Sequence, residues 1–99
     1  MTSIHYTEER QRREDIIKVI GYGEIIKTVE VDRGHRNGPE IHEISNTGII
    51  TILNKNSHKM ITKLIARPGQ IRRYFTDEPI PQGLLEKAFA HQRLGLNNI

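Results

Sequence analysis

Isoleucine-rich segments separated by turn residues occupy the middle of this chain. Residues 40–45, 49–53 and 59–66 each carry several apolar side chains, and polar turn-forming residues separate them at 46–48 and 54–57. β-Branched side chains pack well on a pleated sheet, and short apolar runs joined by such turns are typical of antiparallel strands. The pattern therefore predicts three consecutive strands of a meander.

Helical spacing appears near the beginning of the chain. Ile16, Ile17 and Ile20 recur at the interval of one helix face, and Thr7 is a suitable N-cap residue. We expect this helix to end near Gly21, because glycine commonly follows the last helical turn. The segment that follows is ambiguous, and we expect a short helix or turn that leads into a strand at 27–32.

Two further helices are expected after the meander. Pro68 suits the first turn of a short helix at 67–74, since proline has no N–H to leave unpaired there. The apolar residues from Leu84 to Phe89 follow helical spacing and predict a C-terminal helix. We expect the last residues, 95–99, to fray.

Together these elements predict an α+β fold. An N-terminal helical segment precedes a twisted antiparallel sheet of three to four strands, and the two later helices follow it. We expect the helices to cover one face of the sheet. A length of 99 residues fits a single domain spanning 1–99.

Composition narrows the classes of protein only slightly. The net charge is +3 with a pI near 9.5, which favours an acidic partner such as nucleic acid without requiring one. The chain has no cysteine, so disulfides and thiolate metal sites are excluded. The polar, charged start and the lack of a long apolar run predict a cytoplasmic protein with no signal peptide and no membrane segment.

The strongest cluster of candidate chemistry follows the third strand of the meander. Arg67, Gln70, Arg73 and Tyr74 are close in sequence, and arginine forks match the oxygens of a phosphate. If the segment is helical, Gln70 lies on one face with Arg73 or Tyr74. The alternative is that Arg67 pairs with a carboxylate, Tyr74 caps the core and Arg73 is solvated.

His42 is the candidate for proton transfer, because it stands in the middle of a predicted strand and histidine titrates near neutral pH. The alternative is a partly buried histidine with a satisfied hydrogen bond. Thr62 either bonds a backbone group or donates to a phosphate oxygen. His35 and Arg36 lie in a glycine-rich loop that either closes over a phosphate or is simply solvated.

A metal site is not expected. His42 and Glu43 resemble the start of a zinc-binding HExxH motif, but position 46 is Asn and the segment is predicted to be a strand rather than a helix. We therefore expect neither a metal nor another cofactor.

The segment from Glu40 to Phe75 resembles small nucleases of the barnase–EndoU–colicin–RelE group, which occur as bacterial toxins and in phages and mobile elements. The match covers about a third of the chain, and it rests on His42, Thr62 and Arg67, with Gln70 and Tyr74 as additions.

This resemblance implies metal-independent RNA cleavage, in which the ribose 2′-OH attacks the adjacent phosphate and leaves a 2′,3′-cyclic phosphate. His42 would transfer a proton, with Glu40 or His35 as its partner. Arg67 would stabilise the phosphorane, and Thr62 and Gln70 would position the phosphate. Tyr74 would stack a base, and Arg73, His35 and Arg36 would bind substrate. The partners implied are RNA and, for a toxin, a cognate inhibitor or antitoxin.

Two departures weaken the resemblance: no catalytic carboxylate stands out in the sheet, and the group does not require a C-terminal helix. A non-catalytic nucleic-acid-binding protein is one alternative, although few aromatic residues are available for stacking. A protein-binding module that uses an exposed strand edge is another.

Overall fold

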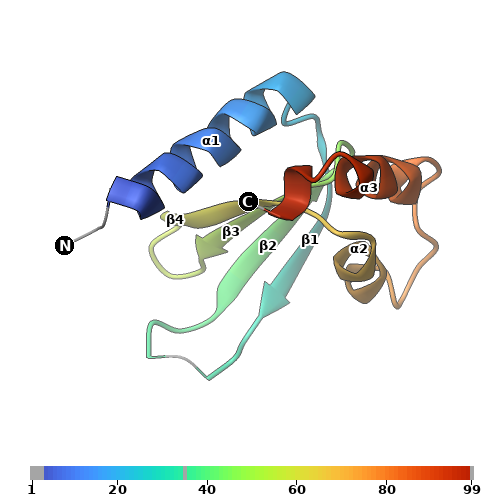
Figure 1. Cartoon of the computed structure of the whole chain (residues 1–99). Helices are drawn as coiled ribbons and strands as arrows, with labels where there is room; N and C mark the ends of the chain where they lie inside the picture. Colours follow the sequence, from blue (N-terminus) through green and yellow to red (C-terminus); the bar gives the residue numbers. More distant parts are fainter. Residues whose placement is uncertain (1–3, 35, 99) are drawn as a thin grey trace.

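The computed structural model describes residues 4–34 and 36–98, and it shows an α+β fold built on a four-stranded antiparallel sheet (Figure 1). In chain order the elements are α1 (Ile4–Ile20), β1 (Ile25–Val31), β2 (Glu40–Ser45), β3 (Ile49–Asn54), β4 (Met60–Ile65), α2 (Pro68–Tyr74), α3 (Leu84–Arg93) and a 3₁₀ turn, η1 (Leu96–Asn98). Each strand pairs with its neighbour in sequence, in the order β1-β2-β3-β4. The predicted fold class and meander are confirmed.

Both faces of the sheet are covered by helices. Ile49 and Ile50 are adjacent on β3 and therefore point to opposite faces, yet both are buried. Figure 1 shows α1 on one side of the sheet and α2 on the other, with α3 beside α2. The expectation that helices cover a single face was wrong, because β3 is apolar on both of its faces and each face requires a cover.

The two apolar layers differ in size. On the α1 side, Ile17 packs with Ile49 and Ile65. On the other side, the larger core joins the sheet to α2 and α3. Its buried members are Ile44, Ile50, Ile52, Ala66, Ile71, Phe75, Leu84 and Ala88. The larger layer fixes α2 against the sheet, and α2 contributes Gln70, Arg73 and Tyr74 to a pocket on this face.

Three element boundaries differ from the prediction. Helix α1 already includes Ile4, so Thr7 lies inside it rather than at its N-cap. Strand β1 begins at Ile25, with no helical turn before it, because pairing with Ser45 extends the sheet to that residue. The C-terminal tail does not simply fray: Asn97 is buried, and its Nδ2 donates a hydrogen bond of 3.3 Å to the carbonyl of Ala66.

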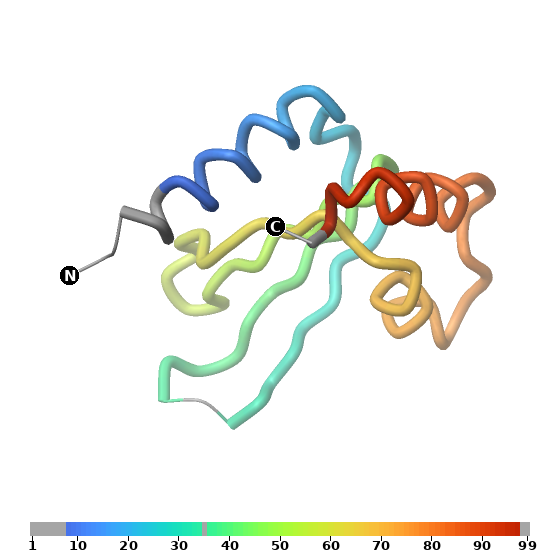
Figure 2. The backbone as a smooth tube through the Cα atoms, in the orientation of Figure 1, coloured from blue at the N-terminus to red at the C-terminus, as the bar shows by residue number. Residues whose placement is uncertain are grey.

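Helix α2 begins where its sequence predicts. Pro68 occupies the first turn, and the side-chain oxygen of Gln70 accepts a 2.8 Å hydrogen bond from the backbone N–H of Arg67. This contact fixes the entry of the chain into the helix. Figure 2 shows how the backbone leaves β4 and turns directly into α2 beneath the sheet.

The outer edge of β4 is partly covered by a side chain from α1. Arg13 Nη1 donates to the carbonyl of Lys63 at 2.8 Å and to Thr62 Oγ1 at 3.1 Å. The guanidinium therefore donates a hydrogen bond to the Lys63 carbonyl at the outer edge of the sheet.

His91 on α3 provides a test of pH-dependent stability. Burial lowers the pKa of its imidazole below the ordinary value of 6.5, and the charge of Lys87 adds to this effect. Within the described part of the chain, its buried Nδ1 has no hydrogen-bond partner. The folded state thus binds a proton at His91 less readily than the unfolded state does.

We therefore expect stability to be complete above the ordinary histidine pKa and to fall as the pH drops through the lowered pKa of the folded state. Urea unfolding measured from about pH 7.5 to about pH 5 should show this loss, across the range in which histidine titrates. His91→Gln should be less sensitive to pH over the same range. An identical slope in both proteins would assign the effect to another group.

Candidate active site

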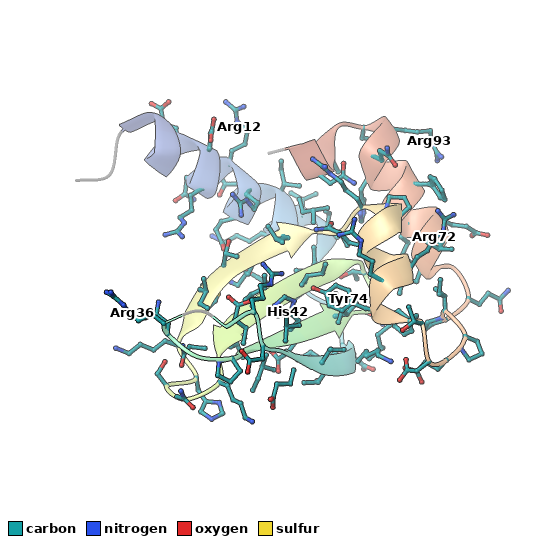
Figure 3. All side chains as sticks on the ribbon, turned by 90° about the horizontal axis from the view of Figure 1, so that it is seen from below. Arg12, Arg36, His42, Arg72, Tyr74 and Arg93 are labelled. Carbon is teal, nitrogen blue, oxygen red and sulfur yellow. The ribbon has the colours of Figure 1, made fainter. Side chains whose placement is uncertain are left out.

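A pocket of about 290 Å³ opens on the face of the sheet that carries α2. The sheet supplies an apolar floor, and the polar side chains around it are Arg33, His42, Gln70, Arg73 and Tyr74. Figure 3 views this face and shows the side chains of His42 and Tyr74 side by side, one from the sheet and one from the helix.

Strand geometry explains the position of His42. Glu40, His42 and Ile44 alternate along β2 and share one face, while β1 and β3 flank the histidine through Val29 and Ile52. The imidazole is fully buried, whereas the Glu40 side chain keeps 18% of its surface exposed. A buried polar ring of this kind needs hydrogen-bond partners.

Both nitrogens of the His42 ring have such partners. Nε2 lies 3.0 Å from Glu40 Oε1, and Nδ1 contacts the hydroxyl of Tyr74. A carboxylate only accepts hydrogen bonds, so Nε2 carries a hydrogen and Nδ1 of the neutral ring accepts from the Tyr74 hydroxyl. The result is a chain of hydrogen bonds that runs from Glu40 through His42 to Tyr74.

The electrostatic surroundings of Tyr74 are mixed. Burial raises the pKa of the phenol above its ordinary value, and the charge of Glu40 acts in the same direction. Arg33 and Arg73 act to lower it. Tyr74 is therefore a neutral phenol at physiological pH, held between a histidine that can take its proton and two cations that attract an anion.

This arrangement can move a proton and bind an anion in one place. A proton accepted by the Tyr74 oxygen can be balanced by transfer of the phenolic hydrogen to His42, with Glu40 stabilising the resulting imidazolium. The guanidiniums beside the pocket can bind the oxygens of a phosphate. His42 itself is too deeply buried to touch a substrate, so it would act through Tyr74.

The structure brings together four of the residues singled out in the sequence. His42, Gln70, Arg73 and Tyr74 all line this pocket. The oxygen of Gln70 is already used by the backbone of Arg67, so a role in binding substrate falls to its amide nitrogen.

The other predicted residues lie elsewhere. Arg67 lines a separate groove between α2 and α3. Thr62 bonds Arg13 at the edge of β4 and does not line the His42 pocket. Arg36 is exposed on the loop between β1 and β2, and its side chain extends away from His42 (Figure 3). His35 lies outside the described residues.

Two members of the site were not among the residues proposed from the sequence as its main components. Arg33 borders the pocket because it follows β1, whose last residue, Val31, pairs with Glu40. The resemblance implies Glu40 only as one of two alternative partners for His42. Its spacing of two residues from His42 on a strand was the pattern that pointed to it, since such residues share a face.

Two further features bear on the kind of site. Within residues 4–34 and 36–98, no group of three or more His, Asp or Glu side chains is gathered as a metal ion would require. In the same part of the chain, no helix is both long enough and apolar enough to span a membrane.

No known protein family, curated protein or solved structure matches this chain.

Proposed function

We propose that this chain is a metal-independent ribonuclease that cleaves RNA by attack of the ribose 2′-OH on the adjacent phosphate. The observation that carries the proposal is the buried His42, which bonds Glu40 on one side and Tyr74 on the other. The anion-binding side chains Arg33 and Arg73 border the same pocket.

In the proposed reaction the Tyr74 hydroxyl contacts the ribose. Its oxygen accepts the proton of the 2′-OH while its own hydrogen passes to His42 Nδ1, and Glu40 stabilises the charged ring. The 2′-oxygen then forms a bond to phosphorus and the bond to the 5′-oxygen breaks. Solvent protonates the leaving oxygen, and the relay returns its proton to solvent.

Charge stabilisation falls to the two arginines that line the pocket. Arg33 and Arg73 line the pocket, and in the proposed reaction they offset the extra negative charge that the phosphate gains in the transition state. This assignment differs from the expectation for Arg67, which lies in the neighbouring groove. The proposal therefore retains the reaction implied by the resemblance and changes which side chains perform it.

The test is incubation of the purified protein with end-labelled transfer RNA and mixed RNA in excess EDTA. We expect cleavage to persist in EDTA, because no metal takes part. The products should carry 2′,3′-cyclic phosphate and 5′-hydroxyl ends, because the 2′-oxygen is the attacking group. The same RNA with 2′-O-methyl groups should remain intact, because its 2′-oxygen cannot lose a proton.

Two other outcomes have definite meanings. Intact RNA together with salt-dependent binding would contradict the cleavage reaction and favour a non-catalytic RNA-binding protein. That alternative has one observation in its favour. The guanidiniums of Arg67, Arg72 and Arg73 form no ion pair with any carboxylate of the described residues.

Cleavage that EDTA abolishes would contradict the metal-independent mechanism.

A further inference from the structure

A second hollow lies beside the proposed active site, between α2 and α3. It measures about 440 Å³ and is lined by Arg67, Arg72 and Phe89, among others. Gln70 and Arg73 line both this groove and the His42 pocket. The two hollows are therefore neighbours, with Gln70 and Arg73 between them on α2.

The groove is positively charged. Arg67, Arg72 and Arg73 are exposed, and they find no carboxylate partner in the part of the chain that the structure describes. The two acidic residues that follow α2, Asp77 and Glu78, are instead paired with Lys27 at 2.7 Å each. The arginines of the groove are thus available to an anionic ligand.

Phe89 gives the groove an aromatic surface. The chain has two phenylalanines, and while Phe75 is buried in the core, Phe89 leaves 40% of its surface exposed. The guanidinium carbon of Arg72 lies 5.8 Å from the centre of the Phe89 ring. An exposed ring beside a cation matches the two contacts that nucleotides offer, a flat base and a phosphate.

We propose that the groove formed by Phe89, Arg67 and Arg72 binds a nucleotide next to the scissile phosphate of single-stranded RNA. This inference rests on the proposed ribonuclease function, which supplies the reason for RNA in the adjoining pocket. An unpaired strand is specified because the face of a base is free to stack on Phe89 only outside a duplex.

The lack of tryptophan in this chain permits a direct test. Phe89→Trp places a single indole in the groove, and a base that stacks on it should quench its fluorescence. The matched control is Leu94→Trp, at a position that is 72% exposed just after α3 and does not line the groove. The ligand is a short 2′-O-methyl single-stranded RNA, which binds without being cleaved.

We expect saturable quenching for Phe89→Trp and none for Leu94→Trp. Phe89→Ala should weaken binding of the same RNA by about tenfold, which is within the range for loss of one stacked base. Arg72→Ala should remove one phosphate contact, so the slope of log affinity against log salt concentration should become less steep by about one unit. Arg12→Ala, an equal loss of charge on α1, should leave that slope unchanged.

Three results would each overturn the inference. They are equal quenching at positions 89 and 94, no binding of the RNA at all, and equal salt slopes for Arg72→Ala and Arg12→Ala. These results are separate from the cleavage reaction, because the methylated RNA reports binding alone. Failure to cleave unmodified RNA, with Phe89→Trp still quenched, would contradict the proposed catalysis and leave the nucleotide site in place.

Discussion

Tyr74→Phe should reduce RNA cleavage by at least about a hundredfold, the lower end of what general acid–base catalysis contributes. The substitution keeps the ring against the core and removes only the hydroxyl that contacts His42 Nδ1. Because His42 is fully buried, the loss of this hydroxyl disconnects the relay from any substrate. The measurement is the single-turnover rate of cyclic-phosphate formation in EDTA.

Tyr22→Phe is the matched control. The Tyr22 hydroxyl is also hydrogen-bonded, since it accepts from Lys63 Nζ at 2.9 Å and donates to Glu14 Oε2 at 3.1 Å, but Tyr22 does not line the His42 pocket. Its removal should leave the rate within a few-fold of that of the unmodified protein. If Tyr74→Phe retained similar activity while folded by circular dichroism, the relay would have no part in catalysis.

The largest loss of stability is expected from Ile50→Ala. Ile50 is fully buried on the second of the central strands, in the layer that joins the sheet to α2 and α3. Removing three carbons there leaves a cavity, and substitutions of this kind cost about 2–5 kcal/mol of unfolding free energy. For a 99-residue chain this is a large part of the total stability. Urea unfolding followed by circular dichroism measures it.

Ile25→Ala serves as the control for Ile50→Ala. Ile25 is at the start of the outer strand β1 and is 55% exposed, so its loss should change the free energy of unfolding by less than about 0.5 kcal/mol. Comparable losses for both variants would mean that the layer containing Ile50 is not the main core.

The sheet was predictable because each strand of the meander carries its own local pattern and turn residues. The cover on both faces was missed although residues 49–53 are apolar on both sides of the strand. Which helix covers which face depends on contacts between distant segments, such as the packing of Ile17 on Ile49. The start of β1 was missed for a similar reason, because Ile25 is held in the sheet by its pairing with Ser45 rather than by its own propensity.

For the candidate site, the sequence identified residue types better than it identified their partners. Gln70, Arg73 and Tyr74 line one pocket as expected, because their spacing along a short helix is local. Arg67 was expected beside them from its proximity in sequence, and Thr62 from the family resemblance. The N-terminal end of α2 directs Arg67 toward α3, and Arg13 engages Thr62 from a helix about fifty residues earlier in the chain. Contacts of that range leave no trace in local pattern.

The contact of Arg13 with the edge of β4 has a consequence for self-association. An uncovered outer strand can add a strand from another molecule, and this is a common route to aggregation. The guanidinium of Arg13 holds the Lys63 carbonyl that such an incoming strand would need. Helix α1 therefore blocks one backbone acceptor at this edge of the sheet, and a chain that lost Arg13 would expose that acceptor to an incoming strand.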